Sequence, residues 1–265
     1  MLRDARSGKV WCCSMSEEHE PHTMTGRRSE VIAGSFGEDL SVSHALLSKG
    51  QAQANTRLPM FLLLHGWGSN EQDLADLMRY VAPYNDYAAL RAPLDMPAAY
   101  AGASGPKGYS WFHDCVPTGE DLDRDAYAAA KAIDRWVSEH IAADRDIVPL
   151  GFSQGGVLAI HLLRLHPERY RAAVSLSGFM APGLVKEAVP ADSRLASLDI
   201  PVFYGYGSAD NVIPRYELYA TAAWLEEHTW LNSHEYHGLD HAVSLEEFSD
   251  IRQWLIQNDI SSGMM

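Results

Sequence analysis

From about residue 40 onwards, short runs of apolar residues alternate with longer segments in which apolar residues recur every three or four positions. The run Met60 to Leu64 contains no polar residue, which is typical of a strand that is covered on both faces of a sheet. The pattern predicts strands at 41–47, 60–64, 87–91, 147–150, 172–176, 200–206 and 232–236, and helices at 70–81, 121–143, 157–163 and 214–227, with one more helix at the C-terminus.

Individual residues mark where these elements begin or break. Ser69, with Gln72 three residues later, has the pattern of a capping box at the start of helix 70–81. Pro214 is a favoured first residue for the helix that follows it. Pro149 lies in what should be a central strand, and because proline has no N–H for the ladder we expect a local irregularity there. Residues 92–119 are rich in Pro and Gly and predict a long surface loop of the kind that often carries function.

The order of the elements predicts an α/β fold with one catalytic domain. Strands that alternate with helices after an early hairpin-like pair, 41–47 with 60–64, give a mostly parallel central sheet with helices on both faces. The segment between strands 172–176 and 200–206 is short, so no large cap domain is expected. We place this domain at residues 38–262.

Residues 1–37 are polar and lack periodicity, so we predict a flexible N-terminal extension outside the fold. Met15 and Met24 are alternative start sites, and the residues before them have the character of an added segment.

Composition and charge narrow the class of protein. A chain of 265 residues with 46% hydrophobic residues can bury one sizeable core. The formal charge of −14 argues against nucleic acid as a partner. Cys12, Cys13 and Cys115 give no disulfide framework, which favours a reducing compartment. Since neither a signal peptide nor an apolar run of membrane-spanning length is present, we expect a cytoplasmic protein without stable membrane insertion.

The strongest candidate for chemistry is the sequence Gly151-Phe152-Ser153-Gln154-Gly155. It follows a predicted strand and precedes a predicted helix, the setting in which Gly-x-Ser-x-Gly forms a sharp turn that presents a serine hydroxyl. The backbone N–H of Gln154 would then lie at a helix N-terminus and face negative charge beside Ser153. A serine hydroxyl is a weak nucleophile until a histidine accepts its proton and a carboxylate orients that histidine.

Five stretches of the chain, in order, resemble the phospholipase/carboxylesterase family of α/β-hydrolases, which includes acyl-protein thioesterases and small bacterial esterases. They are Leu-His-Gly-Trp-Gly-Ser-Asn at 64–70, Arg-Ala-Pro-Leu at 91–94 with Gly-Tyr-Ser-Trp-Phe at 108–112, Gly-Phe-Ser-Gln-Gly-Gly at 151–156, Gly-Tyr-Gly-Ser-Ala-Asp at 205–210 and Gly-Leu-Asp-His at 238–241. They span nearly all of the chain after residue 40. The resemblance implies the α/β-hydrolase fold and a Ser-Asp-His catalytic triad.

Carried over to this sequence, the resemblance makes Ser153 the nucleophile, Asp210 the orienting acid and His241 the general base. The residues support this independently. Asp210 lies just past strand 200–206, where open α/β sheets place catalytic groups, and His241 follows the last strand. His237 remains a rival for the base and Asp240 for the acid, although adjacent residues rarely aim their side chains at each other.

Metal binding is the other open reading of these residues. His234, His237 and His241 could form a zinc site, but their spacing matches no common one. A metal ion could also bind adventitiously to Cys12, Cys13, His19 and His22. We expect neither site, and therefore no metal ion and no cofactor.

The oxyanion hole is expected to combine two backbone donors, the N–H of Gln154 and one from the loop after strand 60–64. The resemblance places the second donor at Trp67. Gly66 and Gly68 would let this backbone approach the substrate, and His65 is expected to brace the loop.

The substrate is less well defined by the sequence. An acyl pocket or the hydrophobic core would equally explain Trp67, Tyr109, Trp111, Phe112, Phe179 and Met180. We take Trp111, Tyr109 and Phe179 as the substrate-binding candidates. The expected activity is that of a serine carboxylesterase for short to medium acyl chains, with a small-molecule ester or thioester as substrate and a monomer or homodimer as the assembly. The alternatives are a thioesterase or lysophospholipase that acts on lipidated protein or lipid, and a non-catalytic binding protein of the same fold.

Overall fold

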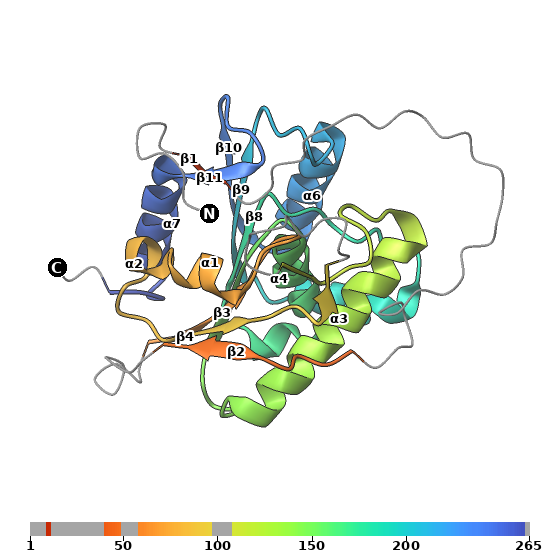
Figure 1. Ribbon diagram of the computed structural model, residues 1–265, viewed down its shortest axis with the longest axis horizontal. Coiled ribbons are helices and arrows are strands. Elements are labelled where there is room, and N and C mark those ends of the chain that lie inside the picture. The colour runs from red at the N-terminus through yellow and green to blue at the C-terminus, as the bar shows by residue number, and fades with distance from the viewer. Residues whose placement is uncertain (1–8, 12–39, 49–57, 97–107, 263–265) are drawn as a thin grey trace.

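Figure 1 shows a computed structural model of the chain, which describes residues 9–11, 40–48, 58–96 and 108–262. Seven strands form the central sheet in the order β10-β9-β8-β7-β3-β4-β2. All neighbours are parallel except β2 and β4, which are antiparallel. The strands are β2 (Ala45–Leu47), β3 (Met60–Leu64), β4 (Tyr87–Leu90), β7 (Ile147–Phe152), β8 (Ala173–Leu176), β9 (Pro201–Gly207) and β10 (Trp230–Tyr236).

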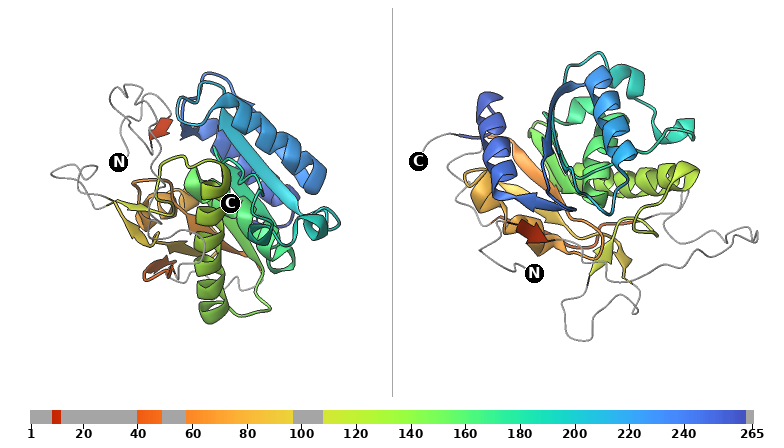
Figure 2. Two further views of the ribbon diagram at one scale, coloured as in Figure 1. Left: turned by 90° about the vertical axis from the view of Figure 1, so that its right-hand side faces the viewer. Right: turned by 90° about the horizontal axis from the view of Figure 1, so that it is seen from above.

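Helices cover both faces of this sheet (Figure 2, right). The apolar side chains of α3, α4 and α6 pack on one face, and those of α1, α2 and α7 pack on the other. The helices are α1 (Glu71–Ala75), α2 (Met78–Val81), α3 (Gly119–His140), α4 (Gln154–Leu165), α5 (Asp192–Leu195), α6 (Arg215–His228) and α7 (Leu245–Gln257), with short 3-10 turns at Pro167–Arg169 and Lys186–Ala188.

The apolar run of β3 shows why the sheet takes this form. Leu62 and Leu64 join the core under α3 and α4, whereas Phe61 and Leu63 join the core under α1 and α7. All four side chains are at most 1% exposed. Since successive side chains of a strand point to opposite faces, a strand buried on both sides must be apolar throughout. The described residues thus form the expected mostly parallel sheet with helices on both faces, and they include no large cap domain between β8 and β9.

Three expected local features differ from the structure. The early strands do not form a hairpin, because β4 lies between β2 and β3. The segment 92–119 is not only a loop, since β5 (Leu94–Asp95) pairs antiparallel with β6 (Tyr109–Ser110). The expected helix 70–81 is two helices. The N–H of Leu77 bonds to the Leu74 carbonyl three residues back, a tighter turn that leaves both side chains in the core.

The cap of α1 also differs from the expected one. Asn70 is the N-cap, and its side chain accepts a hydrogen bond from the backbone N–H of Gln72. Ser69 instead donates from its hydroxyl to Asp73 at 2.6 Å. Both residue types are good caps, so the sequence alone does not choose between adjacent candidates.

Pro149 leaves β7 continuous but shortens one of its ladders. It pairs in register with Leu62 on the β3 side. On the other side, the carbonyl of Ile147 accepts from the N–H of Arg171, and the ladder with β8 begins only at Leu150. The N–H that Pro149 lacks is therefore absent from a part of β7 that is not yet paired with β8.

Part of the N-terminal extension is paired, which corrects the expectation that residues 1–37 lie wholly outside the fold. The strand β1 (Lys9–Trp11) runs antiparallel to β11 (Ala242–Ser244). Backbone pairing of this kind needs no apolar periodicity, so the pattern of the side chains did not reveal it. The rest of the extension, including Cys12, Cys13, His19 and His22, lies outside the described residues.

The start of α7 contains a buried carboxyl group. Ser244 and Glu247 form a capping box, and Glu247 is 1% exposed. Burial raises the pKa of Glu247 to about 8, and the nearby Asp250 carboxylate acts in the same direction. The group is therefore protonated in the folded protein at pH 7 but ionised in the unfolded chain, whose glutamate pKa is 4.5.

This difference predicts how stability depends on pH. Because folding raises the pKa of Glu247, the protonated group stabilises the folded state fully below pH 4.5. This stabilisation is lost as the pH rises through about 8. Gln at position 247 keeps the capping box without the ionisation. In melting experiments, we expect Glu247→Gln to match the wild type near pH 4.5 and to exceed it at pH 8 by at least ~1 kcal/mol, roughly 2–4 °C in Tm. The exposed neighbour supplies the control, Glu246→Gln. Parallel curves for wild type and Glu247→Gln would contradict the prediction.

Candidate active site

Ser153 occupies the sharp turn between β7 and α4. Its backbone angles are φ 55° and ψ −117°, a strained conformation for a residue with a side chain. The flanking glycines are required by close backbone contacts. A Cβ on Gly155 would lie 1.8 Å from the carbonyl oxygen of Leu64, and a Cβ on Gly151 would lie 2.0 Å from the carbonyl oxygen of Gly155. The Gly-x-Ser-x-Gly sequence thus folds as its spacing predicts.

The structure brings Ser153, His241 and Asp210 together in one hydrogen-bonded chain. His241 Nε2 is 3.0 Å from Ser153 Oγ, and His241 Nδ1 is 2.7 Å from Asp210 Oδ2. Ser153 is 3% exposed, and the His241 and Asp210 side chains are 2% and 1% exposed. Low exposure strengthens each of these electrostatic contacts, because little water competes for them.

Backbone contacts fix the orientation of the Asp210 carboxylate. Asp210 follows β9 at the C-terminal edge of the sheet, and its Oδ1 accepts hydrogen bonds from the N–H groups of Val212 and Ile213, both at 2.9 Å. Its other oxygen, Oδ2, is left to His241 Nδ1. An acceptor at Nδ1 favours the tautomer with its proton there, so Nε2 is the free acceptor that faces the serine hydroxyl.

The rival residues have other positions. Asp240 accepts from the backbone N–H of His241, not from its ring. His237 is exposed. His234 bonds to the Asn232 side chain and stacks on Phe203. In the described parts of the chain no group of three His, Cys, Asp or Glu residues could hold a metal ion, so the zinc reading of these histidines has no structural support.

The loop after β3 lies against the candidate nucleophile. A Cβ on Gly66 would lie 3.4 Å from the Cβ of Ser153. The loop is pinned to β6, since Gly68 donates its N–H to the carbonyl of Tyr109 and Tyr109 donates to that of Ser69. Trp67, the predicted oxyanion donor, lies within this pinned segment. Gln154, the other one, is the first residue of α4, where N–H groups have no partner within the helix.

His65 braces this loop, as the sequence suggested. Its Nδ1 donates to the carbonyl of Gly66 at 2.8 Å, and its Nε2 accepts from the N–H of Ala92 at 3.1 Å. These two partners require the neutral ring. Burial lowers the pKa of His65 to about 4, so the ring stays neutral throughout the pH range in which a histidine base would work.

The side chain of Gln154 has a role that the sequence did not reveal. Its Oε1 accepts from the N–H of Trp111, and its Nε2 donates to the carbonyl of Asp114 at 2.8 Å. The side chain is fully buried. It therefore ties segment 110–115 to the residue beside Ser153. No local pattern marks these partners, because they lie about 40 residues away in the sequence.

A cavity of about 190 Å³ lies at the same edge of the sheet. One wall is formed by residues 116–122 at the start of α3, which follow the segment held by Gln154. A second wall is formed by residues 179–184, which follow β8, and a third by residues 214–217, which follow Asp210. Asp123 fixes the second wall, since its carboxylate accepts from the N–H groups of Gly183 and Val185 at 2.8 and 2.9 Å. The cavity is lined by Val116, Pro117, Thr118, Gly119, Leu122, Phe179, Met180, Pro182, Leu184, Pro214, Tyr216 and Glu217.

Only some of the expected acyl-pocket residues line this cavity. Phe179 and Met180 do. Trp111 does not; its side chain is fully buried, and its indole N–H donates to the carbonyl of His65 at 3.0 Å. Phe112 is equally buried. Tyr109 lies beneath the guanidinium of Arg91 at 4.6 Å. Neither Trp111 nor Tyr109 lines this cavity, and their role in substrate binding stays a prediction.

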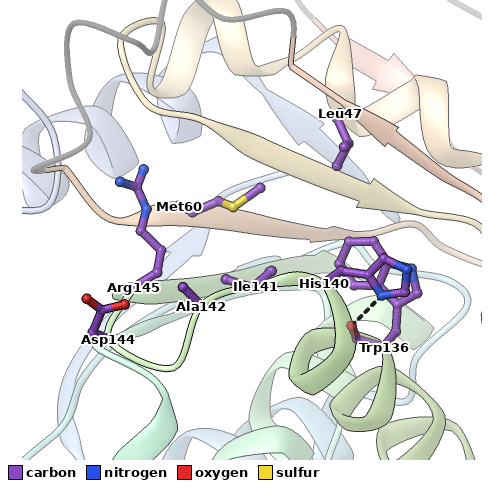
Figure 3. A pocket seen from close by; sticks show the side chains of 8 residues that line it. All are labelled: Leu47, Met60, Trp136, His140, Ile141, Ala142, Asp144 and Arg145. Carbon is purple, nitrogen blue, oxygen red and sulfur yellow. Dashed lines mark hydrogen bonds between the residues drawn. The ribbon is translucent and has the colours of Figure 1, made fainter.

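A larger cavity of about 480 Å³ lies at the other end of the sheet (Figure 3). It is bordered by Met60, the first residue of β3, and by the loop 142–145 that leads into β7. Trp136 and His140 stack at its side, with ring centroids 4.6 Å apart. The candidate catalytic residues lie at the C-terminal ends of the strands, so this cavity is not part of their site.

A hydroxyl, a neutral imidazole and a buried carboxylate in this order can perform acyl transfer. The imidazole accepts the hydroxyl proton as the oxygen attacks a carbonyl, and the carboxylate stabilises the imidazolium that forms.

The profile of the phospholipase/carboxylesterase family matches residues 48–258. The chain belongs to this family. An acyl-protein thioesterase 1 of Kluyveromyces lactis is 27% identical over 78% of this chain and 93% of its own length. A probable carboxylesterase of Oryza sativa subsp. japonica is 30% identical over 76% of this chain and 88% of its own length. Membership of this family makes the chain a serine hydrolase.

A solved structure supports the fold alone. Acyl-protein thioesterase 2 of Zea mays is similar with a TM-score of 0.65 at 21% identity, over 82% of this chain and 99% of that one. In the described residues of this chain, no helix combines the length and the apolar character needed to cross a membrane.

Proposed function

We propose that Ser153, His241 and Asp210 hydrolyse carboxylic esters through an acyl-enzyme. The observation that carries the proposal is the chain of hydrogen bonds from Asp210 through His241 to Ser153. Ser153 Oγ attacks the ester carbonyl while its proton passes to His241 Nε2. The oxyanion accepts hydrogen bonds from the N–H groups of Gln154 and Trp67. The tetrahedral intermediate expels the alcohol, which takes the proton from His241. Water then releases the acid by the same steps and restores the serine.

The smaller cavity, which Phe179 and Met180 line, is the proposed acyl site. Its volume of about 190 Å³ is below the roughly 300–1,000 Å³ of pockets for drug-sized ligands, which favours short to medium acyl chains. Phe179 is the predicted substrate-binding residue that lines it. Thioester hydrolysis is the second candidate, since one of the relatives above is an acyl-protein thioesterase. The same attack on the carbonyl would serve both leaving groups.

We further propose that the enzyme acts in the cytoplasm on a small-molecule ester, as a monomer or homodimer. The support is compositional: Cys12, Cys13 and Cys115 do not form the sequence pattern of a disulfide framework, as expected in a reducing compartment.

Labelling with a fluorophosphonate probe tests the proposed chemistry. We expect one covalent adduct, located on Ser153 by peptide mass spectrometry, and hydrolysis of p-nitrophenyl esters of acetate, butanoate and octanoate. Thioesters of the same acids compare the two leaving groups at constant acyl chain. A protein that is folded by circular dichroism, yet takes no label and hydrolyses none of these substrates, would overturn the proposal.

A further inference from the structure

Glu217 places a carboxylate in the wall of the proposed acyl site. It lies in the first turn of α6, directly after the segment that follows Asp210. Among the described residues that line the cavity, it is the only charged one, and the hydroxyl groups of Thr118 and Tyr216 are the other polar side-chain groups. Most of the remaining lining is apolar, as an acyl chain requires. A lone carboxylate in such a wall weakens the binding of alkyl groups, because the carboxylate loses bound water when an alkyl group packs against it and gains no hydrogen bond in return.

The Glu217 carboxylate has no cation of its own in the described part of the chain. No ion pair or hydrogen bond of its side chain is present there, although the neighbouring Arg215 binds Tyr219 and Glu235. Glu217 is half-buried. The helix N-terminus favours a negative charge at this position, which explains why a carboxylate is tolerated there but supplies no counter-ion from a side chain.

We propose that Glu217 selects acyl groups whose far end carries a positive charge, such as an ammonium group. This inference rests on the proposed function of the site. An ammonium group that enters the cavity pairs with the carboxylate, and its methylene chain packs on the apolar wall near Phe179 and Met180. The net charge of −14 acts in the same direction, since it attracts cationic substrates.

The test compares pairs of p-nitrophenyl esters with equal chain length. Hexanoate is paired with 6-aminohexanoate, and octanoate with 8-aminooctanoate. The readout is the ratio of kcat/KM for the amino ester to that for the plain ester. We expect Glu217→Gln, which removes the charge but keeps the size, to lower this ratio by about ten-fold, in line with a partly exposed charge pair. Glu217→Leu should lower it further and raise kcat/KM for octanoate.

Glu226 supplies the matched control, because it is exposed on the same helix outside the cavity. Glu226→Gln removes the same charge from the protein and is expected to leave the ratio unchanged. Equal ratios in wild type and Glu217→Gln, or equal shifts in the Glu217 and Glu226 variants, would overturn the inference. Those outcomes leave the proposed function standing, since it requires only hydrolysis of the plain esters and labelling of Ser153.

Discussion

Replacing Ser153 with alanine is expected to lower kcat for ester hydrolysis by roughly 10⁴-fold or more, because the acyl-enzyme can no longer form. The fold should survive. Alanine has the same strained backbone as serine, and the variant loses one hydrogen bond, that between Ser153 Oγ and His241 Nε2 at 3.0 Å. Such a loss changes stability by about 1 kcal/mol. The measurements are p-nitrophenyl butanoate hydrolysis and thermal melting of the same preparation.

Ser177 provides the matched control for this experiment. It is also a buried serine with positive φ, at the end of the neighbouring strand β8. Ser177→Ala should retain hydrolysis to within a few-fold and take the fluorophosphonate label, whereas Ser153→Ala should take none. Turnover at the wild-type rate by folded Ser153→Ala would show that a different residue is the nucleophile.

Local patterns predicted the elements that carry the candidate chemistry. The strand, turn and helix around Ser153 follow from an apolar run, two glycines at positions with no room for a Cβ, and a helical pattern. All three lie within about 20 residues. The position of Asp210 just after β9 follows from the rule that open α/β sheets place catalytic groups at the C-terminal ends of their parallel strands. Such features depend on neighbours in sequence or on the topology of the sheet, and both can be inferred from the chain.

Contacts between distant segments explain what the sequence did not reveal. Trp111 and Phe179 are both apolar and both buried in the core, yet only Phe179 also lines the cavity. Which of them faces the cavity depends on the hydrogen bond from Trp111 to His65 and on the side chain of Gln154. The pairing of β1 with β11 joins residues more than 200 positions apart through backbone groups, which leave no pattern in the side chains.

Replacing Asp210 with asparagine should lower kcat by about 10³- to 10⁴-fold while the shape of the site is kept. The reason lies in the two oxygens of the carboxylate. Oδ1 accepts from the N–H groups of Val212 and Ile213, so in the variant the amide oxygen must occupy that position. The NH₂ group then faces His241 Nδ1 and donates to it. This contact stabilises the tautomer with its proton on Nε2, and a protonated Nε2 cannot accept the proton of Ser153.

Asp240→Asn is the matched control, because Asp240 is the adjacent carboxylate and contacts only the backbone N–H of His241 in the described structure. Asparagine keeps an oxygen for that contact, so kcat should fall by no more than a few-fold. Both variants are compared by kcat for p-nitrophenyl butanoate and by Tm. The fluorophosphonate should label Asp210→Asn far more slowly than Asp240→Asn, since labelling also needs the base. If Asp240→Asn is inactive and Asp210→Asn is active, the acid is Asp240, and only the assignments of Ser153 and His241 remain.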